Sequence, residues 1–231
     1  MSLTTLPTID VPNIASDTPL WLALLTTFIA AMSGALRGRE PGRVRYDIVG
    51  IVVFAFFLGV GGGVTRDLLL GATPPVVLRE PAYVIAVLAA ALLVLIVGRW
   101  IARDGWTFLV LDALALGLYA VIGAQMAIEY GLPDIGAIIV GFLASLVGGI
   151  IVAVLRGDTP EILMPGQPYA LLSILGSTIY VLTDQFNATV AAFLCVGSVI
   201  VLRVVTVRWN VRTPSVRPIG SSSDPTSPER P

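Results

Sequence analysis

Residues 61–71 read GGGVTRDLLLG, and they lie at the end of a long apolar run that extends from Ile48 to Leu70. Each glycine lowers helix stability by roughly 1 kcal/mol relative to alanine, so three in a row weaken a helix locally. Arg66 and Asp67 follow at once, and charged side chains inside a membrane are costly and most often functional. The stretch therefore predicts a membrane helix that breaks at Gly61, Gly62 and Gly63 and carries a charged centre just beyond the break.

The composition of the whole chain indicates a membrane protein. Of its 231 residues, 56% are hydrophobic and only 13% are charged, whereas soluble domains carry about 25% charged residues. A helix that crosses a bilayer needs about 20 mostly apolar residues. Segments of about this kind cover residues 20–36, 48–70, 83–98, 106–128, 135–155, 169–183 and 188–207. We therefore predict an all-α polytopic membrane protein with seven transmembrane helices; a soluble bundle is disfavoured because these segments are apolar nearly all round.

Missing residue types exclude several classes of enzyme. The chain has no histidine, all of its basic residues are arginine, and its single cysteine is Cys195. Without histidine or lysine there is no Ser-His-Asp system, no His-ligated zinc and no Schiff base. We expect a protein that is not an enzyme, with no catalytic residue, metal or cofactor and no nucleic-acid partner, and whose surroundings are the lipid bilayer.

The arginines predict the orientation, because positive residues accumulate in cytoplasmic loops. With seven spans, every arginine except Arg66 and Arg79 falls on one side, which places the N-terminus outside and the C-terminus in the cytoplasm of a plasma-membrane protein. Residues 1–19 are predicted as an extracytoplasmic tail. Residues 208–231, rich in Pro, Ser and Arg, are predicted as a disordered cytoplasmic tail.

An internal repeat divides the chain. Residues 48–83 align with residues 134–169 without a gap, and the identities include Gly62 with Gly148, Gly63 with Gly149 and Tyr83 with Tyr169. We predict a first three-helix repeat over residues 20–98, a second over residues 99–183, and a seventh helix over residues 184–207. Three spans are an odd number, so the second repeat enters the membrane from the opposite side, and such inverted repeats place a central site between the halves.

Several residues are candidates for that site. Gly148 and Gly149 repeat the weak point of the first half, and two broken helices facing each other would present backbone carbonyls to a cation at a constriction. Arg66 requires a carboxylate, either Asp67 or Asp112 in the fourth span. Neighbouring positions on a helix diverge by about 100°, so Asp112 is a sensible partner if the helix persists through Arg66, and the choice between the two stays open. Weaker polar candidates, whose hydroxyls and amide often serve packing instead, are Ser33, Thr65 and Gln125.

Residues 61–71 with Thr73 and Pro74, supported by residues 32–36, 110–113 and 122–125, resemble the prokaryotic members of the trimeric intracellular cation (TRIC) channel family. The resemblance implies a homotrimer of seven-helix protomers, each with its own hourglass pore for monovalent cations, chiefly potassium. It also implies that the second and fifth helices kink at their glycines and line the pore. Related bacterial sequences often carry a second Arg-Asp pair, but this chain has Val152 and Ala153 there, so the resemblance implies no role for a second pair in this chain.

The sequence leaves two functions open. The leading one is a passive potassium-permeable channel, which needs no catalytic residue. The alternative is a secondary transporter of a small zwitterion such as glycine, since some relatives have been labelled glycine transporters. In that case Arg66 would bind the carboxylate, and Asp67 or Asp112 the amine, of the substrate.

Overall fold

The computed structural model describes residues 19–40, 44–101, 105–164 and 168–211. Regular structure within these ranges is helical, in the order α1 (Leu20–Arg37), α2 (Ile48–Leu69), α3 (Val76–Arg79), α4 (Ala82–Ile101), α5 (Gly105–Glu129), α6 (Asp134–Arg156), the 3-10 turn η2 (Glu161–Leu163), α7 (Tyr169–Asp184) and α8 (Ala188–Arg208). The predicted N-terminal tail, apart from its last residue, and the C-terminal tail beyond residue 211 lie outside the described residues.

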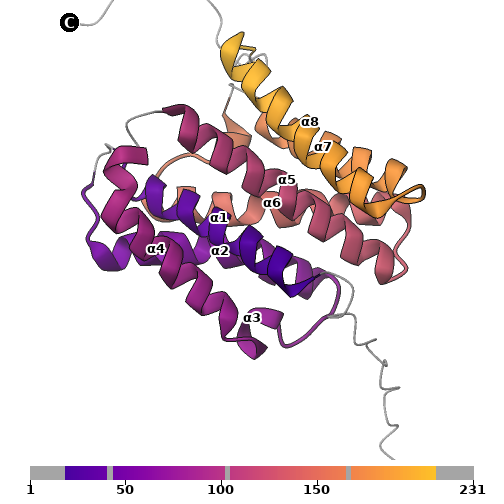
Figure 1. Cartoon of the computed structure of the whole chain (residues 1–231), viewed down its shortest axis with the longest axis horizontal. Helices are drawn as coiled ribbons and strands as arrows, with labels where there is room; N and C mark the ends of the chain where they lie inside the picture. Colours follow the sequence, from indigo (N-terminus) through magenta and orange to yellow (C-terminus); the bar gives the residue numbers. More distant parts are fainter. Residues whose placement is uncertain (1–18, 41–43, 102–104, 165–167, 212–231) are drawn as a thin grey trace, which may run out of the picture.

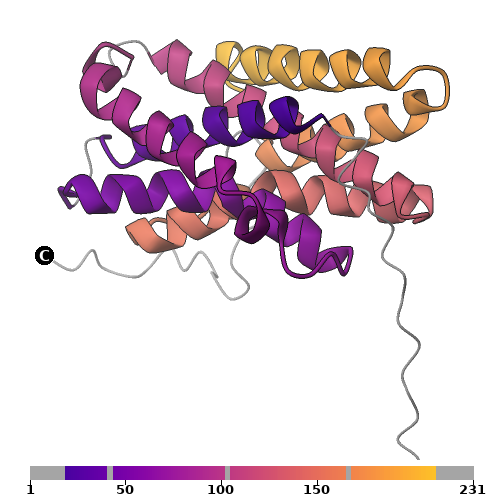
Figure 2. The same cartoon turned by 60° about the horizontal axis from the view of Figure 1, so that its bottom comes forward.

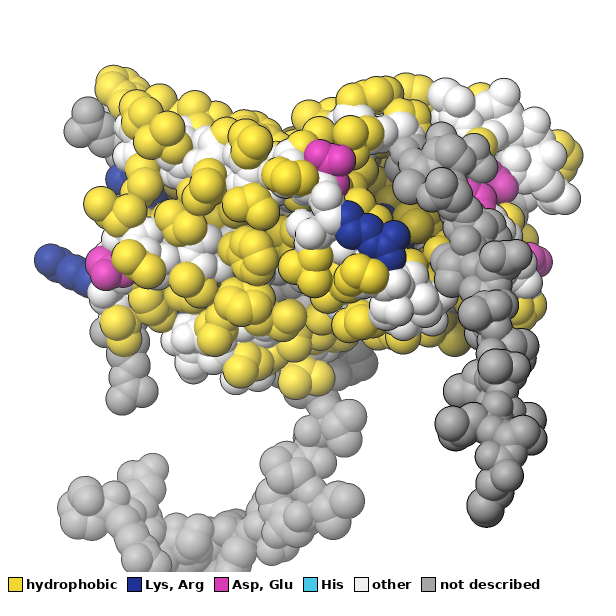
Figure 3. Space-filling model, turned by 90° about the horizontal axis from the view of Figure 1, so that it is seen from below, with side chains coloured by type: hydrophobic (Ala, Val, Ile, Leu, Met, Phe, Trp, Pro, Cys, Tyr) yellow, Lys and Arg dark blue, Asp and Glu magenta, His cyan; other side chains and the backbone are white. Residues whose placement is uncertain are grey.

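The structure confirms an all-α membrane protein. Among the described residues, five helices are long and apolar enough to cross a membrane, namely α1, α2, α5, α6 and α8. Two shorter apolar helical segments, Ala82–Gly98 and Tyr169–Asp184, cover the remaining predicted spans. Large apolar side chains face outward, including Ile85 and Ile96 on α4 and Phe193 on α8, and hydrophobic side chains cover most of the face drawn in Figure 3. Lipid is the medium in which such a surface is stable.

The two halves of the chain pack in the same manner. In the first half α1, α2 and α4 contact one another, and in the second half α5, α6 and α7 do the same. The halves meet where α2 packs on α6 and α1 packs on α5 (Figure 1). The remaining helix, α8, lies along α7 and α5 at one side of the bundle (Figure 2).

Local backbone geometry follows the sequence repeat at the ends of α2 and α6. Gly71 has φ of 70° and its repeat counterpart Gly157 has φ of 74°, a conformation that glycine adopts without the Cβ penalty of other residues. The next amide donates back into the helix in both halves, from Ala72 to the Asp67 carbonyl at 2.8 Å and from Asp158 to the Ala153 carbonyl at 2.9 Å. A short helical segment then follows each Thr-Pro pair, α3 in the first half and η2 in the second.

The predicted helix breaks are wrong for this structure. Helix α2 continues through Gly61–Gly63, and α6 continues through Gly148 and Gly149. The glycines instead permit close helix packing: a Cβ at Gly62 would overlap the carbonyl oxygen of Ala144, and one at Gly61 would lie 3.0 Å from the Cα of Gly148. Contact between the two backbones offsets the low helix propensity of glycine, as it does at small-residue interfaces in membranes.

Candidate functional site

Three cavities lie along α1 between the two halves. The Arg66 cavity has a volume of about 20 Å³ and is lined from α1 by Ala23 and Thr27. The Asp112 cavity, about 10 Å³, is lined from α1 by Ala30, and the Glu161 cavity, about 20 Å³, is lined from α1 by Arg37. At 1.5 Å per residue, the α1 segment from Ala23 to Arg37 is about 21 Å long, compared with a bilayer core of about 30 Å. The cavities therefore form a row along much of a membrane's thickness.

The sequence repeat relates the walls of the first cavity to those of the other two. Gly63 and Tyr83 line the Arg66 cavity, and their counterparts Gly149 and Tyr169 line both the Asp112 and the Glu161 cavities. No atom lies within 4 Å of a Cβ built on Gly63 or on Gly149, so both glycines face open space. The glycine clusters thus contain two kinds of position, those packed between helices and those that line a cavity.

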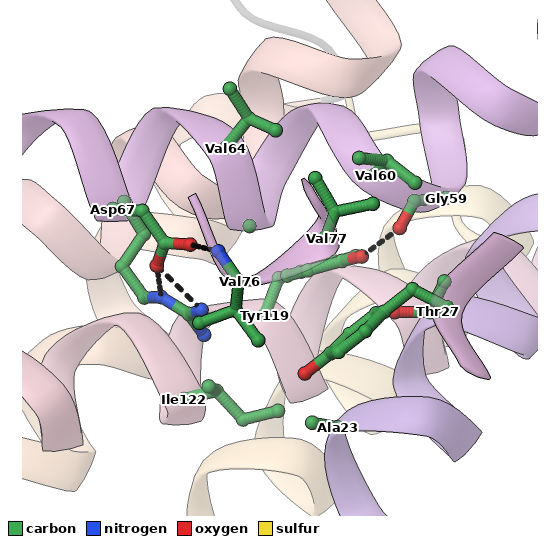
Figure 4. Close-up of a pocket in the computed structure, with 13 residues that line it drawn as sticks. Ala23, Thr27, Gly59, Val60, Val64, Asp67, Val76, Val77, Tyr119 and Ile122 are labelled. Atoms are coloured by element: carbon green, nitrogen blue, oxygen red, sulfur yellow. Dashed lines mark hydrogen bonds and ion pairs between the residues drawn. The ribbon is translucent and has the colours of Figure 1, made fainter. Parts of the chain in front are cut away.

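Tyr119 of α5 separates the Arg66 cavity from the Asp112 cavity. Its side chain lines both of them, and the residue is 6% exposed. The hydroxyl donates a hydrogen bond to the carbonyl oxygen of Gly59 on α2 (Figure 4). A Cβ built on Gly62 would lie 3.1 Å from the tyrosine ring, so the ring packs directly against the glycine cluster. Sequence reasoning missed Tyr119 because a tyrosine within an apolar span carries no distinctive pattern.

The charged centre of the Arg66 cavity is a buried ion pair within α2. Arg66 donates from Nε and Nη2 to Oδ1 of Asp67, at 2.9 and 2.7 Å. The other carboxylate oxygen, Oδ2, accepts the backbone amide of Val76 on α3 at 2.9 Å (Figure 4). Of the two partners left open for Arg66, the structure has Asp67. The arginine side chain is long enough to reach the next residue of its own helix, although the two Cα positions diverge by about 100°.

Asp112 belongs to a second charged group, the charge square, formed by Arg37 of α1, Asp112 of α5, Arg203 of α8 and Glu161 of η2. Arg37 Nη2 lies 3.0 Å from Asp112 Oδ1, and Arg37 Nη1 lies 3.3 Å from Glu161 Oε1. Arg203 Nη2 lies 3.2 Å from Glu161 Oε2 and 4.0 Å from Asp112 Oδ2. Charges alternate around the square, so each arginine faces both carboxylates.

Sequence reasoning missed three of the four members of the charge square. In the sequence argument Arg37 and Arg203 served only to predict which side of the membrane is cytoplasmic. Glu161 lies in a loop between two predicted spans. The sequence does contain a signal that could have identified Arg203. It falls inside the predicted span 188–207, and a charge inside a membrane requires a partner.

The weaker polar candidates do not line these three cavities. Thr65 Oγ1 donates to the carbonyl of Gly61 on its own helix at 2.8 Å, and Gln125 Nε2 donates to Glu129 at 2.8 Å. Ser33 is fully buried in α1. Among the described residues, no group of three His, Cys, Asp or Glu side chains is placed to hold a metal ion. A role for Ser33, Thr65 and Gln125 in a pore stays a prediction.

The fold and the site define an all-α polytopic membrane protein with two similar halves and a row of cavities between them. A family model described as "Glycine transporter" matches residues 20–99 and 109–185, which correspond to the two halves. A UPF0126 membrane protein of Deinococcus radiodurans is 36% identical over 196 residues, covering 84% of this chain and 90% of the relative. The UPF0126 inner membrane protein YadS of Escherichia coli is 28% identical, covering 84% and 94%.

Solved structures give the same assignment. The TRIC channel orthologue of Rhodobacter sphaeroides is 32% identical with a TM-score of 0.74, covering 83% of this chain and 97% of the orthologue. A structure reported for conductance through TRIC cation channels is 28% identical with a TM-score of 0.72, covering 85% and 96%. The chain belongs to the prokaryotic TRIC channel family, which the "Glycine transporter" model also describes. This is a family of channels and not of enzymes.

Proposed function

We propose that the chain is a potassium-permeable channel for monovalent cations, whose pore runs through the row of three cavities within a single protomer. The observation that carries this proposal is the position of the cavities along α1, between two halves related by the repeat. The TRIC channels that the chain resembles are described as cation channels and as trimeric, which supports a homotrimer with one pore in each protomer.

The proposed membrane arrangement has seven spanning helices, α1, α2 and α4–α8, with the two halves inverted relative to each other. The N-terminus lies outside and the C-terminus in the cytoplasm, because this orientation puts nearly all arginines on the inner side. The Arg66 cavity then opens toward the outside and the Glu161 cavity toward the cytoplasm. The plasma membrane is supported by the inner-membrane relative of E. coli.

The proposed constriction is the contact of Tyr119 with the glycine cluster of α2. Passage from the Arg66 cavity to the Asp112 cavity requires the ring to move away from Gly59 and Gly62. Packed glycines of α2 and α6, among them Gly61 and Gly148, hold the two helices close at this level. The arginines on both sides are paired with carboxylates, so neither cavity carries a large uncompensated positive charge that would repel cations.

Potassium flux tests the proposed function. Reconstituted into liposomes, the purified protein is expected to dissipate an outward potassium gradient without any added substrate, whereas protein-free liposomes hold it until valinomycin is added. The flux is expected to rise steeply with the gradient rather than saturate. Flux that appears only with an amino acid, or that saturates at the rate of a carrier, contradicts the channel.

Truncation of Tyr119 tests the constriction. Tyr119→Ala removes the ring between two cavities and is expected to raise the potassium flux several-fold. Tyr119→Phe keeps the ring and removes the hydroxyl, with its hydrogen bonds to Gly59 and with Thr27. It is expected to raise the flux less, since each such bond contributes about 1 kcal/mol. The same liposome assay measures both variants. An unchanged or lower flux for Tyr119→Ala, in protein that elutes as the wild type does on gel filtration, would place the constriction elsewhere.

A transporter of glycine is a second candidate, favoured by the description of the matching family model and by the opposite charges of Arg66 and Asp67 in one cavity. In this structure Arg66 and Asp67 bond to each other, and Asp67 also accepts the Val76 amide, so a bound substrate would have to displace these contacts. Arg66→Gln distinguishes the two functions. A transporter loses glycine uptake in this variant, whereas the channel retains potassium flux and changes only its conductance or open probability.

A further inference from the structure

Residues 160–162, between α6 and α7, cover one end of the row of cavities. Pro160, Glu161 and Ile162 form a wall of the Glu161 cavity, which shares Gly149 and Tyr169 with the Asp112 cavity behind it. At the other end, Val76 and Val77 of α3 form a wall of the Arg66 cavity. Val76 and Ile162 are repeat counterparts, so each end of the row is covered by a short helical segment that follows the Thr-Pro pair of its half.

The two covering segments are held in different ways. α3 is tied to the cavity by its backbone, because the Val76 amide donates to Asp67, a residue that is 1% exposed. η2 is tied by side chains: Glu161 contacts Arg37 through one carboxylate oxygen and Arg203 through the other, and Ile162 packs against a buried apolar cluster. Glu161 is the member of η2 that makes ion pairs to the long helices. The backbone hydrogen bonds of η2, from Leu163 to Pro160 and from Met164 to Glu161, stay within the loop.

Glu161 is also the accessible corner of the charge square. Its side chain is 44% exposed, whereas the side chains of Asp112, Arg203 and Arg37 are 3%, 8% and 11% exposed. The other three corners lie on the long helices α1, α5 and α8. Loss of Glu161 from the square therefore frees the loop, while Arg37 keeps Asp112 at 3.0 Å. Arg203 keeps Asp112 at 4.0 Å and the ring of Tyr169 beneath its guanidinium.

We propose that residues 158–164 form a lid over the Glu161 cavity and that Glu161 is its latch, closed on Arg37 and Arg203. Because Arg203 lies on α8, the latch joins the helix outside the repeat to the mouth of the row. The lid admits or excludes solutes arriving from its side of the membrane. The role of the lid in regulating ion entry rests on the proposed channel function. The opening of the lid can nevertheless be measured without any ion flux.

An introduced thiol reports the opening of the lid. Gly149→Cys places a cysteine in open space behind the lid, while the native Cys195 is fully buried and gives little background. The protein, in nanodiscs, is treated with a membrane-impermeant maleimide, and the modification rate is followed by mass. Adding Glu161→Gln is expected to raise this rate about tenfold, the effect of losing two partly exposed ion pairs. An unchanged rate overturns the proposal.

Two controls restrict the effect to the latch. Asp158→Asn removes a carboxylate from the same loop, but its partner is Arg156 at 2.9 Å, so the rate is expected to change less than about twofold. A Gly63→Cys reporter in the Arg66 cavity is expected to keep its rate in the Glu161→Gln background. An equal rise in either control means general loosening of the fold and overturns the latch.

A double mutant tests whether Glu161 and Arg203 act together. If both belong to one latch, Arg203→Gln combined with Glu161→Gln gives about the same rate as Glu161→Gln alone, and multiplied rates would contradict a shared latch. Potassium flux of the wild-type protein is measured separately. If the wild-type protein shows no potassium flux but Glu161→Gln is modified faster, the channel function is refuted and the lid is retained. If the wild-type protein conducts potassium but Glu161→Gln is modified at an unchanged rate, the lid is refuted and the channel function is retained.

Discussion

Replacing Gly62 by alanine is expected to destabilise the protein strongly, whereas the same change at the adjacent Gly63 leaves it as stable or more stable. A Cβ at Gly62 would overlap the carbonyl oxygen of Ala144 and lie 3.1 Å from the ring of Tyr119. Backbone on the facing helix cannot rotate away, so α2 and α6 must separate, at a cost of about 3 kcal/mol or more. A melting temperature lower by roughly 10 °C, measured on the purified protein in detergent, is the expected result for Gly62→Ala.

Gly63→Ala is the matched control for this experiment, because nothing lies within 4 Å of its Cβ. It gains the helix propensity of alanine, about 1 kcal/mol, without a clash. Because Gly63 lines the Arg66 cavity, the added methyl group narrows the proposed path and is expected to reduce potassium flux. If the two alanine variants melt at the same temperature, close packing at Gly62 is not what holds α2 against α6.

Asp67→Asn is expected to be the most destabilising single change of charge in the Arg66 cavity. Both residues of the pair are buried, with Arg66 6% and Asp67 1% exposed. Loss of the carboxylate leaves a guanidinium that cannot be deprotonated without its counter-charge, and breaking a buried pair in this way costs about 3–5 kcal/mol. The variant is expected to melt roughly 10 °C below the wild type.

The double variant Arg66→Gln with Asp67→Asn separates charge from packing. Removing both charges restores neutrality, so its melting temperature is expected to recover toward that of the wild type. Arg66→Gln alone leaves a buried carboxylate that still accepts the Val76 amide, and it is expected to be intermediate. A double variant as unstable as Asp67→Asn would mean that the pair contributes through its hydrogen bonds and shape rather than through its charge.

The helices and the repeat were predictable from the sequence because both depend on patterns within short segments. Apolar runs of membrane length predict the long helices to within a few residues, for example 48–70 against Ile48–Leu69 for α2. The glycine breaks were wrong because low helix propensity is a local property, while the benefit of a close contact at Gly62 depends on Ala144 in the other half. Such a contact is visible only once the two halves are placed together.

The charged residues show where sequence reasoning stopped. Arg66 and Asp67 were found because they lie inside a span, but their pairing depends on how the arginine side chain folds along α2. The charge square brings together α1, α5, α8 and the loop before α7, so no spacing along the chain indicates it. The sequence argument used Arg37 only to predict the orientation, and that use hid its role as the partner of Asp112.

Single-channel recording tests the central claim, that cations pass through the cavity row of one protomer. Protein carrying Gly63→Cys is placed in a planar bilayer between potassium chloride and sodium chloride solutions, and a bulky impermeant thiol reagent is added while openings are recorded. We predict discrete openings with a linear current–voltage relation and a reversal potential set by cations, followed by block of the current in this variant and not in the wild type. Absence of unitary openings, or openings that persist at full amplitude after the introduced thiol has been shown to be modified, would contradict the account.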